Sequence, residues 1–356
     1  MTRLKFIGFA AAAVLLSGAI MSASLLAADV YLPHRAERSA GLNRWGYRGP
    51  VLGRKQAGEV RAAMLGGSTT FGYGVTWDEA IPAVLEGLSN AAHPDVRLHV
   101  ANLGYNNEGA YALLPTLRDF EYLNADIVIL YPGYNDLIGD DAPNLSVFRH
   151  ESPVFRLTGY FPILPLALGE KALALRYGGD LGAAYDAARG GSPGKTVFRP
   201  NLANRTSAAA MEAATTLSES LSRQLNRVET EAPKAASTSG VAGCASPWIH
   251  FCDSVYHAVR YALDGGRVVI VVSPPSSPES ASNPLPRQQR ALTAMIAARF
   301  ADTPRVRFVD VSQAVDLSDP DVSFDGMHLS VDGNRIVAKR LVEPVHAAAG
   351  LVRGTP

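Results

Sequence analysis

This chain of 356 residues has no net charge, only two cysteines and no long apolar run after residue 28. Its 33 basic residues equal its 33 acidic ones, and the basic residues form no stripe or cluster. The sequence therefore predicts no basic surface patch that could bind a polyanion, and nucleic acid is not an expected partner. Without a second apolar run, no later segment is expected to span a bilayer. The length favours one large decorated domain over two small ones.

Residue sets that hold metals or phosphates are also missing. No group of histidine, cysteine and carboxylate residues has metal-ligand spacing. The glycine-rich segment 64–72 has no Gly-Lys-Ser/Thr sequence and no lysine, as a phosphate-binding loop would require. Neither a metal nor a cofactor is expected.

The two cysteines, Cys244 and Cys252, leave two interpretations open. On one continuous helix they would lie ~12 Å apart along the axis, beyond the reach of a disulfide. Pro247 lies between them and favours a helix that begins there, with Cys244 in a loop that can fold back. A disulfide, which an exported chain permits, and two free thiols both remain possible.

The N-terminus carries an export signal. Arg3 and Lys5 precede an uncharged, mainly apolar run over residues 6–28. In a helix this run crosses a hydrocarbon core of roughly 30 Å, whereas the apolar centre of a cleaved signal peptide has only about 7–15 residues. An uncleaved membrane anchor is therefore favoured, although Ser22 and Ser24 leave cleavage open. The basic residues place the remaining chain outside the cytoplasm.

Short apolar runs alternate with longer amphipathic segments over most of the chain. This alternation predicts an α/β fold of three layers, α/β/α, with a mostly parallel sheet of about five strands. The expected strands are 60–65, 98–103, 126–131, 267–273 and 305–311. The expected helices are 78–88, 110–123, 248–263, 287–300 and 331–348, beside the N-terminal hydrophobic helix.

The pattern also divides the chain into regions. Residues 1–30 are the signal anchor or signal peptide, and the polar segment 31–56 is a connector. The main domain is expected over 57–350, with an insertion at about 138–265. Residues 155–168 of that insertion are apolar but interrupted by Arg156, Pro162 and Pro165, so they are not expected to span a bilayer. A loop that covers the core is favoured, and a cap on the active site or a segment at the membrane interface are the alternatives.

The first motif that can support chemistry runs from Met64 to Gly72 and follows the first strand. Its glycines permit a sharp turn with Ser68 at the apex. Ser68 is either an exposed nucleophile or a helix cap, the commoner role of such a serine. The nucleophile elbow of α/β-hydrolases requires glycine at positions 66 and 70. Position 70 is Thr70, so that rule is only half met.

Two polar clusters follow the second and third strands. They are Ala101–Gly109 and Tyr131–Asp136. Singly, each is an ordinary polar turn. Because the carboxyl ends of parallel strands share one edge of a sheet, their amide groups can converge on a single oxygen, as a tetrahedral oxyanion requires.

The last motif pairs Asp325 with His328 shortly before the final helix. A carboxylate three residues before a histidine can bind Nδ1 and leave Nε2 free to accept a serine proton. Asp-x-x-His is common at protein surfaces. Of the eight histidines, however, only His328 lies in a glycine-containing loop with an acid at this spacing.

In this order the motifs resemble the SGNH/GDSL hydrolase family. Gly66-Gly67-Ser68 looks like its first block, with Gly67 where aspartate is usual. Gly133-Tyr134-Asn135-Asp136 matches its third block, and Asp325-Gly326-Met327-His328 matches its fifth. The segment Asn43–Gly49 resembles one that precedes the nucleophile in exported members. The resemblance implies an SGNH/flavodoxin-like fold.

The resemblance also implies roles for individual residues. Ser68 would be the nucleophile, His328 its base and Asp325 the partner of the histidine. The oxyanion would be bound by the Ser68 N–H, the Asn135 side chain and one further backbone N–H. Counting from Asn102 places that further donor at Asn107, where the family has glycine. Gly104 and Gly109 are the alternatives.

The expected function is hydrolysis of acyl esters, acetyl esters among them, outside the cytoplasmic membrane. The substrate would be a small-molecule, glycan or lipid ester, and the N-terminal segment would hold the enzyme at the membrane; cleavage of that segment would give a secreted enzyme. Two alternatives remain open. One is an O-acyltransferase that acts on an extracellular glycan with the same site. The other is a catalytically silent binding module.

Overall fold

The computed structural model describes residues 41–137, 144–162, 244, 246–280 and 283–354, together with isolated helical positions between 8 and 28. The chain divides into two compact units, one formed by 1–46 with 151–231 and the other by 47–150 with 232–356. No helix within these described ranges is long and apolar enough to cross a membrane. The predicted anchor lies mostly outside the described residues, as does most of the insertion, so both stay predictions.

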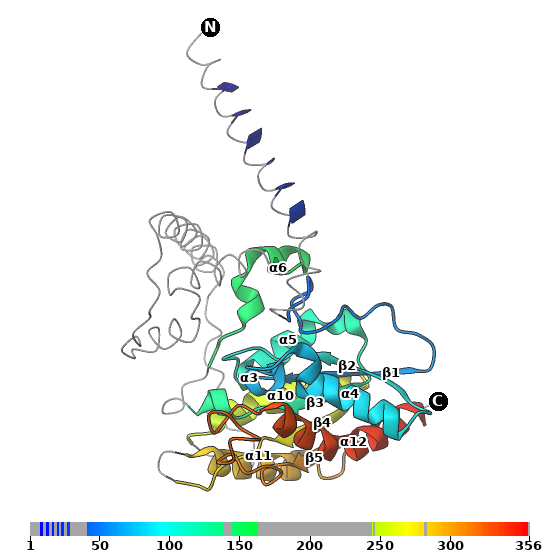
Figure 1. Ribbon diagram of the computed structural model, residues 1–356, viewed down its shortest axis with the longest axis vertical. Helices are drawn as coiled ribbons and strands as arrows, with labels where there is room; N and C mark the ends of the chain where they lie inside the picture. The colour runs from blue at the N-terminus through cyan, green and yellow to red at the C-terminus, as the bar shows by residue number, and fades with distance from the viewer. Residues whose placement is uncertain are drawn as a thin grey trace. The chain divides into compact units, whose positions relative to one another are not determined.

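A five-stranded sheet forms the centre of the second unit, and all its neighbouring strands are parallel (Figure 1). The strand order is β2-β1-β3-β4-β5, which confirms the predicted α/β class. The strands are β1 (Glu59–Gly66), β2 (Arg97–Asn102), β3 (Ile127–Tyr131), β4 (Val268–Ser273) and β5 (Val306–Asp310). From β1 the chain adds β2 on one side of the sheet and then β3, β4 and β5 on the other, so the strand order reverses between β1 and β3. Ligands of doubly wound sheets bind outside the carboxyl ends of the strands at such a point.

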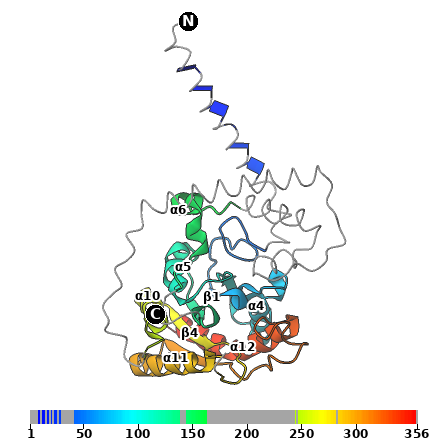
Figure 2. The same ribbon diagram turned by 90° about the vertical axis from the view of Figure 1, so that its left-hand side faces the viewer.

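Helices cover both faces of this sheet, as Figure 2 shows. One face carries α4 (Ile81–Ala92) and α12 (Val331–Arg353). The other face carries α5 (Leu113–Asp119), α10 (Ile249–Asp264) and α11 (Leu285–Phe300). Strands buried on both faces read as continuous apolar runs. Every residue of β1, β3 and β4 is buried accordingly.

Prolines explain two of the differences between the observed and the predicted helix boundaries. Pro82 has no N–H to donate to Asp78, so α4 begins at Ile81, after a separate 3₁₀ turn over Trp77–Glu79. Pro115 likewise has no N–H to continue a helix from Ala110. The predicted helix over 110–123 is therefore split into a 3₁₀ turn, α5 and a second 3₁₀ turn.

The described residues 151–162 of the first unit contain a short helix, α6 (Pro153–Thr158). Ser152 caps it by accepting a hydrogen bond from the Phe155 N–H. The helix ends at Gly159, whose positive φ closes the last turn. This helix lies in the apolar part of the predicted insertion, and residues 163–168 of that part lie outside the described residues.

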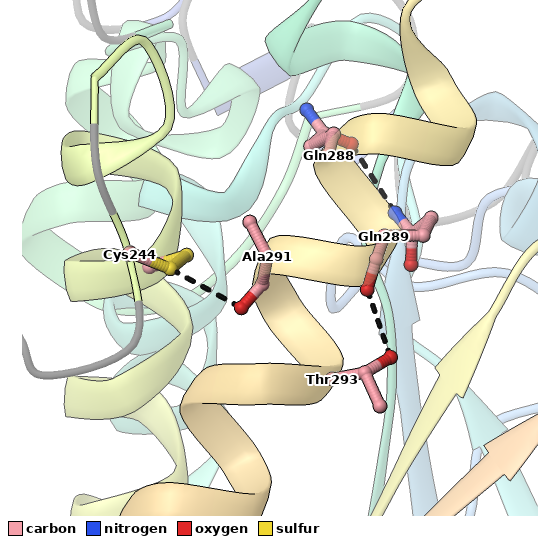
Figure 3. Close-up of a disulfide and its surroundings, with 6 residues drawn as sticks. Cys244, Gln288, Gln289, Ala291 and Thr293 are labelled. Carbon is pink, nitrogen blue, oxygen red and sulfur yellow. Dashed lines mark hydrogen bonds between the residues drawn. A yellow bond between two sulfur atoms is a disulfide. The ribbon is translucent and has the colours of Figure 1, made fainter. Parts of the chain in front are cut away.

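Cys244 and Cys252 form a disulfide, so of the two interpretations left open by the sequence the structure has the paired one. Cys252 lies in the first turn of α10, whereas Cys244 lies in the segment before that helix. The two Cα atoms are therefore 6.3 Å apart. Figure 3 shows the Cys244 sulfur facing α11, where it contacts the Ala291 carbonyl oxygen at 3.4 Å.

Candidate active site

Ser68 is the first residue of a short helix, α3 (Ser68–Phe71), which follows β1 directly. Gly67 is the N-cap, so Ser68 is not the capping residue of this helix. Two glycines allow the turn to pack closely. A β-carbon on Gly66 would lie 2.6 Å from the Tyr131 carbonyl oxygen, and one on Gly104 would lie 2.8 Å from the Phe71 nitrogen. The sequence thus confines Ser68 to the carboxyl end of β1, beside the end of β3.

His328 connects Ser68 to Asp325. Its Nε2 lies 2.8 Å from the Ser68 Oγ, and its Nδ1 lies 2.5 Å from an oxygen of the Asp325 carboxylate. The Ser68 side chain is buried, and the imidazole is only 12% exposed. A carboxylate on Nδ1 fixes the tautomer in which Nε2 can accept a proton from the hydroxyl. The three groups are therefore in hydrogen-bond order for proton transfer.

The loop before α12 fixes the orientation of this histidine. The Phe324 N–H and the Ser323 hydroxyl both donate to the His328 carbonyl oxygen, at 3.2 and 3.0 Å. Gly326 has a φ of 78°, a conformation that glycine adopts without strain. The His328 N–H donates to Asp325 at 2.7 Å, in addition to the side-chain contact. The loop thus holds the acid and the imidazole together before any substrate is present.

Asp325 remains ionised in this arrangement. Partial burial alone would raise its pKa. The hydrogen bonds from the His328 side chain, the His328 N–H and the Met327 N–H lower the pKa, and together they outweigh the burial. The net effect is a pKa below the usual value of an aspartate. An ionised carboxylate stabilises the imidazolium that forms when the histidine takes a proton.

Two aromatic side chains pack around the histidine. The Tyr73 and His328 ring centroids are 4.7 Å apart. The Phe324 ring stacks on the imidazole with the planes within 13° and the centroids 5.8 Å apart. The sequence motifs gave no indication of Tyr73, because it lies between the serine motif and the helix that follows.

Asn135 lies in the 3₁₀ turn Tyr134–Asp136 after β3, and its side chain reaches the serine turn. Its Nδ2 donates to the Glu108 carbonyl oxygen at 2.9 Å, which leaves a second N–H on the same nitrogen. The residues around it form a small pocket beside Ser68. Among those that line it are Gly67, Ser68, Glu108, Gly109, Leu113, Tyr131 and Asn135.

The three residues expected as the further oxyanion donor lie in different surroundings. The N–H of Gly104 donates to the side chain of Asn102 at 3.2 Å and is already used. Asn107 is exposed and is not among the residues that line the pocket, and its carbonyl accepts a hydrogen bond from Asn144. Gly109 lines the pocket together with Ser68 and Asn135. Gly109 thus lies beside Ser68, whereas Asn107 lies at the surface with a φ of 62°.

Asp136 fixes the position of the loop that carries Gly109. Its two carboxylate oxygens accept hydrogen bonds from the Ala110 N–H at 2.9 and 3.0 Å. Burial raises the pKa of Asp136 to about 7, although the Ala110 hydrogen bond acts in the opposite direction. A β-carbon on Gly109 would lie 2.5 Å from this carboxylate, so the glycine is needed for the close contact. The β3 turn and the β2 turn are thereby joined beside Ser68.

Two further residues hold the serine turn and were given no role by the sequence. Arg48 donates to the carbonyl oxygens of Phe71, Gly72 and Val75. Asn102 donates to the carbonyls of Thr70 and Phe71 at 3.0 and 3.2 Å. Arg48 belongs to the segment Asn43–Gly49 quoted above. Its contacts lie more than 20 residues away along the chain, so no local pattern reveals them.

No metal-binding group of three or more histidine, cysteine, aspartate or glutamate residues occurs within the described part of the chain.

Several solved structures are similar to this chain. A lipolytic protein of the G-D-S-L family from Desulfitobacterium hafniense is 12% identical, covering 80% of this chain and 99% of its own, with a TM-score of 0.39. A GDSL-like lipase from Bacteroides thetaiotaomicron is 12% identical, covering 83% and 93%, with a TM-score of 0.41. A family 3 carbohydrate esterase from Clostridium thermocellum is 13% identical, covering 82% and 99%, with a TM-score of 0.40. No protein-family model and no curated protein sequence matches the chain.

Proposed function

We propose that this protein is a serine esterase that hydrolyses acyl esters with Ser68 as nucleophile. The observation that carries the proposal is the position of His328, whose two ring nitrogens lie 2.8 Å from the Ser68 hydroxyl and 2.5 Å from the Asp325 carboxylate. A histidine that only stabilised the fold would not need an acid on one nitrogen and a hydroxyl on the other. The order of the motifs, which resembles the SGNH/GDSL hydrolases, supports the same function.

The reaction proceeds in two halves. His328 Nε2 takes the proton of the Ser68 hydroxyl while Ser68 Oγ attacks the ester carbonyl carbon. The imidazolium then gives this proton to the alcohol oxygen, the bond from carbon to that oxygen breaks, and an acyl-serine remains. Water repeats the sequence with the same histidine as base and releases the acid. Asp325 keeps its negative charge throughout and stabilises the imidazolium.

The tetrahedral intermediates carry a negative oxygen that needs preorganised donors. The free N–H of Asn135 Nδ2 is one donor. The N–H of Ser68 is a second, because it lies in the first turn of α3, where helix geometry provides no acceptor. Gly109 is the proposed source of the third. Each donor of this kind contributes about 3–4 kcal/mol to the transition state.

The substrate we propose is an ester with a small acyl group, such as acetyl; Leu113 and Tyr131 are among the residues that line the pocket with Ser68 and Asn135. We place the enzyme outside the cytoplasmic membrane and held by its N-terminal segment. Support for this location comes from Arg3 and Lys5 ahead of the apolar run.

The direct test compares wild type, Ser68→Ala and Ser89→Ala on a short-chain chromogenic ester. Ser89 is also a buried serine, in α4, and within the described residues its hydroxyl has no hydrogen-bond partner. Ser68→Ala is expected to abolish turnover without changing the melting temperature. Ser89→Ala is expected to retain wild-type turnover. Wild-type turnover in Ser68→Ala would refute the proposal.

A further inference from the structure

The side chain of Arg48 is almost completely enclosed, although it carries a charge. The residue is 6% exposed, and its guanidinium lies over the Phe71 ring at 4.3 Å from Cζ to the ring centroid. Burial lowers its pKa to about 10, with Asp78 and Glu79 acting in the opposite direction. The side chain therefore keeps its charge at neutral pH. A buried cation destabilises the fold unless it is paired or hydrogen-bonded. The groups that Arg48 binds therefore indicate its role.

Those partners are the carbonyl oxygens at the end of α3 and just beyond it. Nη1 donates to Phe71 and, at 2.6 Å, to Gly72, while Nη2 donates to Val75 at 2.5 Å. The last carbonyls of a helix have no partner within the helix and carry its negative dipole end. Arg48 thus supplies charge-assisted bonds to three carbonyls, of which Phe71 and Gly72 also accept from Asn102 and the Val75 N–H. Gly72 has a φ of 85°, and a β-carbon there would lie 2.9 Å from Nη1, so glycine leaves the room that Arg48 occupies.

The segment held in this way connects the two reacting side chains. The N–H groups of Gly72 and Tyr73 donate to the Ser68 carbonyl oxygen at 2.9 and 3.0 Å. The Tyr73 ring packs on His328 at 4.7 Å. Residues 71–75 therefore contact Ser68 through the backbone and His328 through a side chain. A movement of this segment would change the distance between the hydroxyl and the imidazole.

We infer that Arg48 is a positioning residue of the proposed esterase, which sets the Ser68–His328 geometry by holding residues 71–75. Asn102 assists from the adjacent strand, since its Nδ2 donates to Thr70 and Phe71 and its carbonyl accepts the Arg48 N–H at 3.0 Å. The inference rests on the proposed function, because it requires a reaction at Ser68. It assigns to Arg48 a contribution to rate in addition to any contribution to stability.

Arg61 offers a matched control for a purely structural role. It is 3% exposed and donates to the carbonyls of Leu123 and Gly53 and to the Glu59 carboxylate. It lies near the amino end of β1, five residues before Gly66 and so roughly 16 Å along the strand from the serine turn. Both arginines are thus buried and bind several oxygens, but only Arg48 reaches residues 71–75.

The experiment compares wild type, Arg48→Lys, Arg48→Met and Arg61→Lys. The readouts are kcat and KM for p-nitrophenyl acetate, the second-order rate of Ser68 labelling by a fluorophosphonate, and the melting temperature. Displacing a reacting group by about 1 Å costs ~100-fold in rate. Arg48→Lys keeps the charge but cannot reach three carbonyls at once. It is expected to lower kcat and labelling by about 10–100-fold with little change in KM, and Arg48→Met by more. Arg61→Lys is expected to lower the melting temperature and leave both rates within about twofold of wild type.

Asn102→Ser provides a second route if Arg48→Met does not fold, because it removes the other side-chain donor to the Phe71 carbonyl and the donor to Thr70. It should show the same fall in kcat and labelling. Wild-type rates in Arg48→Lys and Asn102→Ser, with a melting temperature lowered as in Arg61→Lys, would overturn the inference and leave the esterase proposal intact. A wild-type protein that neither turns over the ester nor is labelled at Ser68 would overturn both.

Discussion

Gly67 and Asn135 are in such close contact that a β-carbon on residue 67 would collide with the Asn135 Nδ2. Asn135 is a proposed oxyanion donor, so the missing side chain at position 67 is what lets its amide approach the serine turn. Glycine at position 67 thus leaves room for this contact.

Substitutions at these two positions should therefore lower the rate of the proposed reaction. Asn135→Ala removes a donor and should reduce kcat by about 100–1,000-fold with a small effect on KM. Gly67→Ala displaces the same amide and should reduce kcat by a smaller factor. Gly87→Ala, in α4, is the matched control, because a β-carbon there meets nothing within 4 Å. Equal activity in Gly67→Ala and Gly87→Ala would show that the contact does not matter for turnover.

Asp325 is expected to matter through its charge more than through its shape. In Asp325→Asn the amide keeps a similar volume but cannot stabilise the imidazolium, so kcat should fall by about 100–10,000-fold. Asp321→Asn, an exposed acid four residues earlier in the chain, is the control and should retain wild-type kcat. The comparison is made by measuring the steady-state kcat of wild type, Asp325→Asn and Asp321→Asn above pH 7. A loss of less than fivefold in Asp325→Asn would assign the relay to another group.

The sequence predicts the sheet well, because parallel strands buried on both faces leave unbroken apolar runs such as 127–131. It also leads to Ser68 and His328, since glycine turns and the Asp-x-x-His spacing are local. Contacts that join distant residues are not readable in this way. The hydrogen bonds from Arg48 to residue 75, the aromatic contact of Tyr73 with His328 and the exposure of Asn107 all depend on how separate loops pack. Local periodicity contains no information on such packing.

Asp136 should make stability depend on pH near neutrality. Its pKa is about 7 in the folded protein and has a normal value of 3.8. Because the folded state binds this proton more tightly, the contribution of Asp136 is largest below pH 3.8 and is lost as pH rises to about 7. Wild type should thus lose more unfolding free energy than Asp136→Asn between pH 5 and pH 8.

Urea unfolding of wild type and Asp136→Asn at several pH values measures this difference. Both proteins contain the same histidines, so these do not contribute to the difference between the two curves of unfolding free energy against pH. Asp325 and Asp310 have lowered pKa values, so they titrate below this window. Their stabilising effect is present above their normal pKa and is lost as pH falls through the folded value. Parallel curves for wild type and Asp136→Asn would mean that Asp136 titrates normally.

The disulfide between Cys244 and Cys252 should stabilise the region where α10 meets α11. In the chain-entropy model a loop this short contributes about 2–3 kcal/mol to the free energy of unfolding. Cys244→Ala removes the bond and leaves the fully buried Cys252 side chain in place, so the only atom lost is the partly buried Cys244 sulfur. Urea unfolding should show wild type with reductant and Cys244→Ala without it at a similar lower stability, because both lack the cross-link. Identical unfolding of wild type with and without reductant would mean that the bond does not form in solution.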